Sequence, residues 1–350
     1  MVLSLDPNLK PAVRVAPAKL NLTLAVVGRR TDGFHDLHSV MVPLELADRI
    51  SVARAADVTG EDDSLVVEGL DCGPLRENLV LRALSAVRAA VRASLGPGHP
   101  TPGLAARLDK RIPVAAGMGG GSSDAAAALD AALEAWGVDG AMNGADVAAL
   151  RRHVATGLGS DVPFFLAGGP ALIEGRGEHV TALGQLAGPS PGVLVVTPAV
   201  PASTAAVFMA LDDAGGPQGY ARATAATSTH LATEWRAGLR ADGLVARAGV
   251  LASANDLANA ASVVVPGLRD LRRRLIRRLG RPVGLSGSGP TLWVLYASRA
   301  EADNAATMVR EAIAEGTIVG PGSARPSVMT TAIATKEQAR GSGEEGKSSV

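Results

Sequence analysis

Apolar residues recur at helical spacing in several parts of the chain. Between residues 78 and 95 they occupy positions 79, 80, 83, 84, 87 and 91, and a glycine follows, so this segment is predicted to be an amphipathic helix. An alanine-rich run that ends at Trp136 is a second strong helix former. Further helices are predicted over residues 145–156, 203–211, 245–261, 267–279 and 301–315.

Short apolar runs between turn residues predict strands over residues 40–52, 193–197 and 290–296, with a turn at Asp48 and Arg49 inside the first. Residues 3–28 are also predicted to be extended. Helices and strands follow one another without a regular βαβ period, which favours an α+β fold over a doubly wound parallel sheet.

The chain is predicted to hold two domains and a tail. Residues 184–192 are rich in Gly, Pro and Ser, as expected of a domain junction, and residues 335–350 have the polar, charged composition of a disordered segment. The 350 residues, 47% hydrophobic and 19% charged, are enough for two globular cores.

Charge and aromatic content exclude some partners. Lys+Arg and Asp+Glu balance at 34 each and aromatic residues make up 3%, so neither nucleic acid nor an anionic membrane is expected to bind. Cys72 is the only cysteine, which excludes a disulfide framework and fits a reducing compartment. No signal peptide is predicted, and four prolines in the uncharged stretch 179–211 argue against a membrane span. We therefore expect a soluble cytoplasmic protein.

The most informative chemistry lies in a glycine-rich segment. Four glycines in five positions give a backbone that turns easily and approaches a ligand closely. Ser122 and Ser123 are predicted to cap the alanine-rich helix, whose free N–H groups and positive dipole end form a phosphate site. The candidate phosphate-binding residues are Pro113, Val114, Ala115, Ala116, Gly117, Met118, Gly119, Gly120, Gly121, Ser122 and Ser123.

This segment differs from the two commonest phosphate loops. A Walker loop would require a lysine after the glycines, and the dinucleotide fingerprint would require glycine at position 122, where the chain has serine. A flexible linker is the other interpretation, but linkers rarely adjoin a capped helix of about 14 residues. The segment therefore predicts a protein that handles nucleotides.

Lys19 and Asp161 are candidates for the chemistry itself. Lys19 lies in an apolar run, where an ammonium needs a carboxylate or phosphate partner, although an edge-strand lysine that discourages aggregation would look the same. Asp161 lies in a tight loop before an apolar segment, where a carboxylate is either catalytic or a local cap for backbone N–H groups. The residues alone leave both questions open.

Two further turns carry polar or aromatic groups. Residues 28–39 combine a turn with Phe34, His35 and several charges, and residues 284–291 form a second glycine-rich turn before a strand. Each could equally be an ordinary hairpin turn. His35 and His38 have no other histidine or cysteine at a metal-site spacing, so zinc is not expected.

Taken together, these segments resemble the GHMP kinase superfamily, whose three motifs occur here in order at residues 16–22, 113–126 and 284–291. Asn255-Asp-Leu matches another segment frequent in that family. Within it, Lys19-Leu-Asn-Leu, Gly28-Arg-Arg-Thr-Asp-Gly-Phe-His and Gly159-Ser-Asp-Val-Pro-Phe-Phe are similar to one branch. That branch uses ATP to phosphorylate the 2-hydroxyl of a cytidine-diphosphate-linked substrate in the methylerythritol phosphate route to isoprenoids.

The resemblance implies a two-domain α+β fold, with an N-terminal ribosomal-S5-like domain over residues 1–187 and a ferredoxin-like domain over residues 188–334. It implies ATP with Mg²⁺, without assigning the metal ligands. By motif position it makes Lys19 and Asp161 the catalytic pair, in which Asp161 takes the proton of the attacking hydroxyl and Lys19 stabilises the charge. The resemblance places Asn21, Phe34 and His35 at the cytidine end of the substrate.

Some positions depart from the family pattern. Phe34 replaces a common tyrosine, Asp124 a frequent asparagine and Ser160 an alanine, while Phe208 is the suggested second aromatic for the cytosine. Two other interpretations remain, another GHMP kinase such as a homoserine kinase and a GHMP-fold binding protein without catalysis. The first would leave residues 29–35 unexplained, and the second would not be expected to retain the catalytic pair and the loop.

Overall fold

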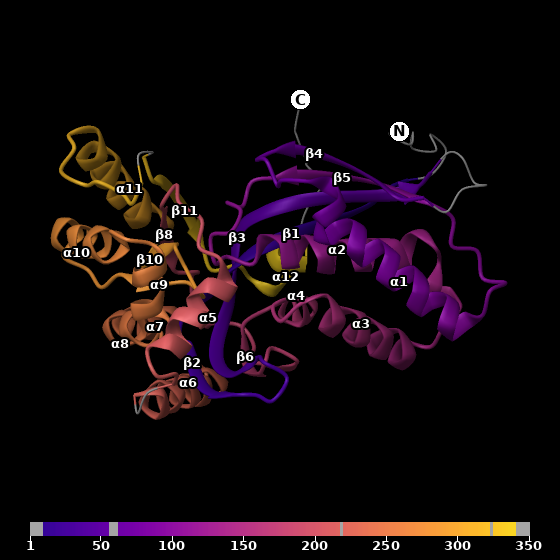
Figure 1. Ribbon diagram of the computed structural model, residues 1–350, viewed down its shortest axis with the longest axis horizontal. Helices are drawn as coiled ribbons and strands as arrows, with labels where there is room; N and C mark the ends of the chain where they lie inside the picture. Colours follow the sequence, from indigo (N-terminus) through magenta and orange to yellow (C-terminus); the bar gives the residue numbers. More distant parts are fainter. Residues whose placement is uncertain (1–9, 56–61, 218–219, 323–324, 341–350) are drawn as a thin grey trace.

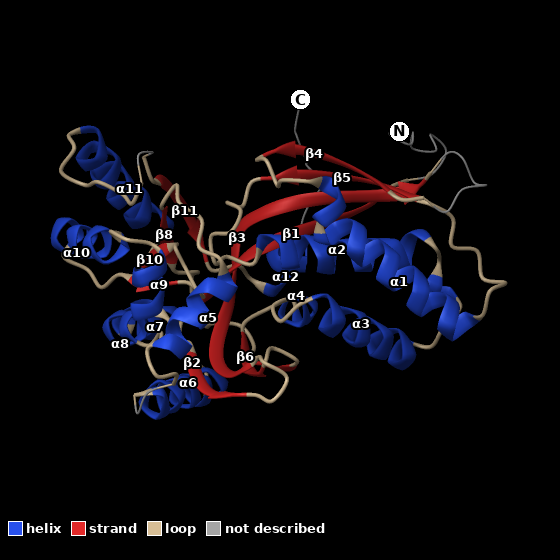
Figure 2. Ribbon diagram, viewed as in Figure 1, coloured by secondary structure: helices blue, strands red, loops and turns tan. Residues whose placement is uncertain are grey.

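The computed structural model describes residues 10–55, 62–217, 220–322 and 325–340. Two sheets form its framework, each covered by helices, with the N-terminal lobe on the right and the C-terminal lobe on the left (Figures 1 and 2). The predicted α+β class is therefore confirmed. The predictions for residues 3–9 and 341–350 lie outside the described residues. Among those described, no helix is both long enough and apolar enough to cross a membrane.

The N-terminal lobe is built on a seven-stranded sheet. Its main path is β4-β5-β3-β6-β7, and β1 and β2 both pair with β3 in antiparallel fashion. The strands are β1 (Ala12–Asn21), β2 (Ala25–Arg29), β3 (His35–Arg54), β4 (Ser64–Gly69), β5 (Leu104–Lys110), β6 (Ala171–Gly175) and β7 (His179–Ala182). The helices of this lobe are η1 (Leu75–Glu77), α1 (Leu79–Leu95), α2 (Gly120–Ala135), η2 (Val138–Gly140), α3 (Gly144–Leu158) and α4 (Val162–Ala167).

The C-terminal lobe has a four-stranded antiparallel sheet in the order β11-β8-β10-β9. Its strands are β8 (Gly192–Thr197), β9 (Gly284–Leu285), β10 (Leu292–Tyr296) and β11 (Ser327–Ala332). Its helices are α5 (Thr204–Asp213), α6 (Ala221–Arg236), α7 (Ala241–Ala246), α8 (Ala248–Ser253), α9 (Ala258–Val264), α10 (Leu268–Leu279) and α11 (Arg299–Ala314). The division between the domains at residue 187 stays a prediction, although the two sheets separate between residues 183 and 191.

β3 is one continuous strand, so the turn predicted at Asp48 and Arg49 is wrong. Asp48 is 1% exposed, and its carboxylate bonds Lys110 and the backbone N–H groups of Arg111 and Ile112. Asp48, whose charge suggested a turn, is thus paired with a lysine and two backbone N–H groups inside the N-terminal lobe.

The helix predicted over residues 245–261 is also wrong as a single element. The chain there forms α7, α8 and α9, because residues 254–256 pair with the N-terminal lobe instead of continuing a helix. Leu24 donates its N–H to Ala254 O at 2.7 Å and accepts from Asp256 N–H at 2.9 Å. This bridge joins the two lobes.

Two smaller corrections concern helix ends. α2 begins after Gly119, which has a left-handed φ of 68°, and no side chain caps it, so Ser122 and Ser123 lie inside the first turn. The segment predicted to be disordered from residue 335 contains α12 (Lys336–Arg340), whose Ala339 is buried against the N-terminal lobe. α12 contacts β1 and β3, and Gln338 Nε2 donates to Glu45 Oε1 at 3.0 Å, although composition alone assigned these residues to a tail.

Candidate active site

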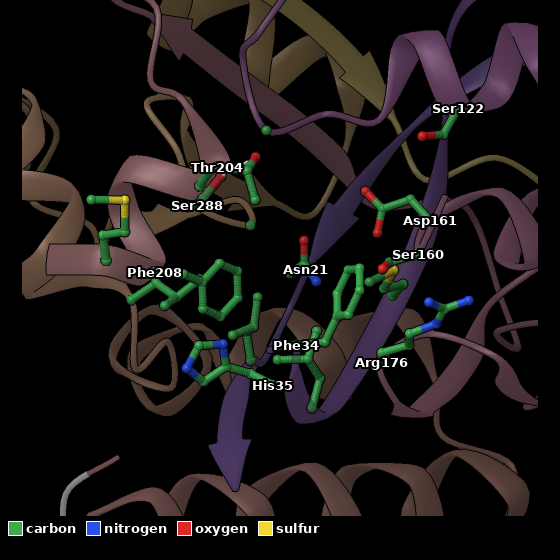
Figure 3. Close-up of a pocket in the computed structure, with 18 of the residues that line it drawn as sticks. Asn21, Phe34, His35, Ser122, Ser160, Asp161, Arg176, Thr204, Phe208 and Ser288 are labelled. Atoms are coloured by element: carbon green, nitrogen blue, oxygen red, sulfur yellow. Dashed lines mark hydrogen bonds between the residues drawn. The ribbon is translucent and has the colours of Figure 1, made fainter. Parts of the chain in front are cut away.

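A cavity of about 560 Å³ lies between the two lobes (Figure 3). Its walls come from β1, the β2–β3 turn, the glycine loop, the residues before α4, the β6–β7 turn and α5. The residues with polar or aromatic side chains in this wall include Lys19, Asn21, Arg29, Phe34, His35, Ser122, Ser160, Asp161, Arg176, Thr204, Phe208, Asp212 and Ser288.

Lys19 and Asp161 approach each other in this cavity. Lys19 is 3% exposed, and its Nζ lies 2.7 Å from Asn21 Oδ1 and 3.4 Å from Asp161 Oδ2. Asn21 Nδ2 donates to Ser39 Oγ at 2.9 Å, which turns the amide oxygen toward the lysine. The edge-strand interpretation of Lys19 fails, since its ammonium is buried among these partners.

The carboxylate of Asp161 remains available to a ligand. Asp161 stands at the N-cap position of α4, but its side chain accepts no hydrogen bond from the helix backbone. The side chain is 32% exposed and points into the cavity (Figure 3). The capping interpretation therefore does not describe this residue, and a proton acceptor stands beside a buried cation.

The glycine loop is held through its backbone. Lys19 N–H donates to Met118 O at 2.9 Å, and Ser286 Oγ donates to Gly117 O at 3.0 Å. A Cβ on Gly117 would lie 2.4 Å from Ser286 O, so glycine permits this close approach. The second glycine-rich turn, residues 284–291, is thus a support for the first and not an isolated hairpin.

Asn255 supports that turn in its place. Its Nδ2 donates to Leu285 O and Gly287 O, both at 3.0 Å, and its Oδ1 accepts from Leu257 N–H at 2.9 Å. The Asn255-Asp-Leu segment therefore has a structural role. It holds the second glycine-rich turn, which in turn supports the glycine loop beside Lys19.

Aromatic side chains define the other end of the cavity. Phe34, from the β2–β3 turn, and Phe208, from α5, point into it from opposite sides (Figure 3). His35 stacks on Phe208 with ring centroids 4.7 Å apart and the planes inclined by 23°, and its Nε2 lies 2.8 Å from Asp212 Oδ1. The guanidinium carbon of Arg176 lies 5.0 Å from the centroid of Phe34. Flat faces beside hydrogen-bonding groups suit a planar polar ring.

A buried cluster of one lysine and two aspartates lies below the loop. Lys110 Nζ bonds Asp48 and, at 2.7 Å, Asp124 Oδ2. Burial raises the pKa of Asp124 to about 8, although the Lys110 charge opposes this shift. One ammonium does not neutralise two buried carboxylates, so the proton on Asp124 removes the surplus charge.

A second cavity, of about 570 Å³, lies beside the first half of the loop. Besides loop residues, its wall includes Leu70, Lys110, Arg111 and Val200. It offers apolar and cationic surface next to the loop, on the side where β5 ends.

The structure distributes the predicted site residues over several places. Lys19, Asn21, Phe34, His35, Gly117, Ser122 and Asp161 line the first cavity, and Pro113, Val114, Ala115 and Ala116 line the second. Met118 and Gly120 are buried, Gly119 and Gly121 line neither cavity, and Ser123 faces a third cavity behind α2.

Sequence reasoning missed Arg176, Thr204, Asp212 and Ser288, which also line the first cavity. Thr204 Oγ1 and Ser288 Oγ lie 3.0 Å apart, although the residues are far apart in the chain. Ser288 lies in the second glycine-rich turn, residues 284–291, but no local pattern marks the other three, because each reaches the cavity through the packing of distant elements. No group of three His, Cys, Asp or Glu side chains that could hold a metal occurs among the described residues.

Comparisons with known proteins agree with this architecture. Residues 78–169 match the GHMP kinases N terminal domain and residues 239–315 match the GHMP kinases C terminal model. A solved 4-(cytidine 5'-diphospho)-2C-methyl-D-erythritol kinase covers 91% of this chain and 99% of its own, with a TM-score of 0.60 at 31% identity. A homoserine kinase from Cytophaga hutchinsonii has a TM-score of 0.63, covering 95% of this chain and 97% of its own, at 18% identity, which shows the shared fold alone.

Two relatives named 4-diphosphocytidyl-2-C-methyl-D-erythritol kinase match at higher sequence identity. The protein from Pelotomaculum thermopropionicum is 38% identical over 296 residues, which are 85% of this chain and 93% of that protein. The protein from Geobacter metallireducens is 36% identical over 84% of this chain and 92% of its own length. On this identity and coverage, the chain belongs to the 4-diphosphocytidyl-2-C-methyl-D-erythritol kinase family of the GHMP kinases.

Proposed function

We propose that this protein transfers the γ-phosphate of ATP to the 2-hydroxyl of 4-diphosphocytidyl-2-C-methyl-D-erythritol, in the methylerythritol phosphate pathway to isoprenoid precursors. The observation that carries the proposal is the Lys19–Asp161 pair, with Nζ and Oδ2 3.4 Å apart, between a glycine loop and a cavity end lined by Phe34 and Phe208. This arrangement has a place for a phosphate donor, a proton acceptor and a planar nucleobase.

Asp161 is proposed as the general base. Its carboxylate accepts the proton of the 2-hydroxyl as the oxygen attacks the γ-phosphorus, and the bond from that phosphorus to the β–γ bridging oxygen breaks. Lys19 stabilises the negative charge that develops at the reacting oxygens. Because Asn21 and the loop carbonyl of Met118 hold Lys19 in place, most of the catalysis would be positioning and charge stabilisation.

The nucleotide is proposed to lie along residues 113–123. We place the triphosphate at the loop and the start of α2, where backbone N–H groups and the helix dipole favour phosphate. The second cavity, lined by residues 113–116, has room beside the loop for the base and ribose. Gly119 and Gly120 would act indirectly, by letting the loop pack against Lys19 and Lys110.

Mg²⁺ is proposed to arrive with the triphosphate. This ion takes oxygen ligands, usually one or two from the protein with the rest from phosphates and water, so a dedicated three-residue cluster is not needed. The Ser122 hydroxyl is an oxygen group in the cavity wall next to the loop and fits such a partial ligand set, while Asp161 keeps its carboxylate for the proton. When bound, the ion would neutralise phosphate charge.

The cytosine is proposed to stack between Phe34 and Phe208. His35 is fixed by the 2.8 Å bond between its Nε2 and Asp212 and by its stacking on Phe208. The remaining edge of the imidazole is then available for a hydrogen bond to the cytosine. Arg176 covers one side of the Phe34 ring and limits its motion. Phe34 keeps a stacking face without the hydroxyl of a tyrosine.

We further propose that the domains divide near residue 187 and that the reaction takes place in the cytoplasm. The two sheets lie on either side of residues 183–191, and the lone Cys72 is a free thiol, as a reducing compartment allows.

An acceptor panel tests the substrate assignment. Purified protein with ATP and Mg²⁺ is assayed for ADP formation with 4-diphosphocytidyl-2-C-methyl-D-erythritol, homoserine and mevalonate, each with cytidine monophosphate as a competitor. We expect turnover with the cytidine-linked acceptor and inhibition by the cytidine nucleotide. Faster turnover of homoserine, or no effect of cytidine monophosphate, would assign the protein to another GHMP activity.

A further inference from the structure

A third cavity, of about 290 Å³, lies behind the phosphate-loop helix α2, outside the proposed active site. Its wall is formed by β1, α2, α3, α4 and α12, elements that are far apart in the sequence. α12, drawn in yellow, lies beside α2, α4 and β1 in Figure 1 and packs on β1. The size of this rear cavity is at the lower end of the range for small-molecule sites, about 300–1,000 Å³.

Three arginines give the rear cavity a positive charge. Arg14 comes from β1, Arg151 from α3 and Arg340 from α12, whereas Asp130 is the one carboxylate among the described residues of the wall. Arg151 and Asp130 form a bidentate pair with distances of 2.7 and 2.5 Å, and Arg14 pairs with Glu134 outside the wall.

Arg340 has no such partner among the residues that the structure describes. No described carboxylate lies within ion-pair distance of its guanidinium, which donates one long hydrogen bond, of 3.5 Å, to Ala167 O. Among the described residues, one of the three positive charges in the wall therefore lacks a carboxylate partner and can pair with a bound anion.

Ser123 supplies a second, independent observation. It is 1% exposed, lines the rear cavity, and its hydroxyl has no hydrogen-bond partner among the described residues. A buried unpaired hydroxyl costs free energy and calls for a ligand or water beside it. Its neighbour Ser122 faces the catalytic cavity, so consecutive residues of α2 serve two different cavities.

We propose that the rear cavity is a second ligand site, which binds a small phosphate-bearing anion between Arg14, Arg151 and Arg340. Guanidinium groups present planar pairs of N–H donors that match phosphate oxygens, and the Ser123 hydroxyl adds a further donor. The proposal does not depend on which acceptor the kinase phosphorylates.

The position of the site links it to the catalytic elements. α2 carries the glycine loop and α4 follows Asp161, and both contribute to the wall of the rear cavity. Phe165 of α4 lines this cavity and also lies 3.0 Å from the position of a Cβ on Gly119. A bound anion would thus contact side chains, such as Phe165, that pack behind the glycine loop. It would also draw α2, α4 and α12 together.

Calorimetric titration tests the proposal on the full chain. The protein is first saturated with a non-hydrolysable ATP analogue, so that the phosphate loop is filled and its binding is measured separately. Inorganic phosphate, glycerol 3-phosphate and acetate are then titrated at constant ionic strength. We expect one further site for the two phosphates, with acetate binding much more weakly.

Variants locate that site. Arg340→Gln and Arg14→Gln should each weaken phosphate binding about tenfold, since each removes a charged hydrogen-bond donor. Arg152→Gln is the matched control, because Arg152 neighbours Arg151 on α3 but is exposed and outside the wall. Absence of a second phosphate site, equal binding of acetate, or unchanged affinity in both Arg14→Gln and Arg340→Gln would overturn the proposal. Failure of the nucleotide analogue to bind would contradict the proposed nucleotide site instead.

Discussion

The side chain of Asp161 is 32% exposed and caps no backbone N–H, so its carboxylate can accept a proton from a bound hydroxyl. Asp161→Asn keeps the shape of this group and removes its basicity. We expect kcat to fall by about 10²–10⁴-fold, the usual contribution of a general base, with little change in ATP binding. Steady-state kinetics with the cytidine-linked acceptor measure this change.

Lys19→Met should also slow turnover, and the losses in the double variant should not add, because the two groups act as a unit. Ser160→Ala is the matched control, since Ser160 precedes Asp161, lines the same cavity and replaces an alanine common in the family pattern. Near-normal kcat in Asp161→Asn would remove this residue from the role of base.

His35 connects the cavity to α5 through Asp212 and Phe208. His35→Ala removes a stacked ring and a hydrogen-bonding edge, and loss of a buried hydrogen bond of this kind costs about 1–3 kcal/mol. We expect KM for the cytidine-linked substrate to rise about 5- to 150-fold, while KM for ATP changes little.

His38→Ala serves as the control for this measurement, because His38 is also on β3 but does not line the cavity. Equal increases of KM for both substrates in His35→Ala would show that the residue does not bind the cytidine end.

At the residue scale, the sequence identified the candidates and, through the family resemblance, the Lys19–Asp161 pair, but not the other partners. The residues alone left Lys19 open between an edge-strand and a catalytic role, and only the family resemblance favoured the catalytic one, because burial and the contact with Asn21 depend on strand pairing. Arg176 and Asp212 had no recognisable pattern, since they reach the cavity only after β6, β7 and α5 are packed.

The glycine loop is the element on which nucleotide binding depends. A Cβ on Gly119 would lie 3.0 Å from Lys19 Cγ and from Phe165 Cζ, and the residue has a φ of 68°, which favours glycine. Gly119→Val should therefore displace the loop and abolish binding of an ATP analogue while the protein stays folded. Equilibrium binding and circular dichroism measure the two effects.

Gly157→Val provides a comparison for the same type of substitution. No atom lies within 4 Å of a Cβ at Gly157, and the residue lies in α3, away from the loop. We expect this variant to bind the nucleotide normally. Unchanged nucleotide affinity in folded Gly119→Val would refute the assignment of the loop.

The cluster below the loop makes stability depend on pH. An unfolded Asp124 ionises near pH 4, but burial raises its pKa to about 8 in the folded protein. The contribution of this group to stability is thus complete below about pH 4 and is lost as the pH rises to about 8, because the unfolded chain then releases the proton more readily.

Asp124→Asn removes that titration and retains the shape. We expect the free energy of unfolding of the wild type to decrease relative to the variant between about pH 5 and 8. Urea unfolding of both proteins at several pH values measures the difference. Parallel pH profiles would show that Asp124 ionises normally in the folded state.

At the element scale, the sequence correctly predicted the helices in which the apolar residues, at helical spacing, form the buried face. α1, α3, α5, α10 and α11 are confirmed to within a few residues. It missed α6, because Thr224 and Ser228 form part of the buried face of that helix and weaken its apolar pattern. The sequence predicted one helix where the structure has α7, α8 and α9, because the backbone bridge between residues 24 and 255 that interrupts the helix has no sequence signal.

At the scale of the molecule, the two lobes share a packed interior. Leu24 and Val26 of the N-terminal chain belong to the hydrophobic core of the C-terminal lobe, and another core cluster contains both Leu20 and Trp293. The α+β class followed from the irregular succession of predicted helices and strands, and the two-domain fold from the family resemblance. The full set of residues that line the cavity between the lobes could not be predicted, nor could the rear cavity, since each depends on how distant elements pack.

We propose that this cavity directs phosphate from ATP to one hydroxyl of a cytidine-linked acceptor. Phosphorus NMR of the reaction mixture tests it most directly, with wild-type protein, ATP, Mg²⁺ and 4-diphosphocytidyl-2-C-methyl-D-erythritol. We predict a new phosphomonoester signal that is not split by a vicinal proton, because the 2-carbon of the acceptor carries a methyl group and no hydrogen; it should form together with ADP and be strongly reduced with Asp161→Asn. ATP hydrolysis to free phosphate without that signal, or a split signal from phosphorylation at another position, would contradict the proposed reaction.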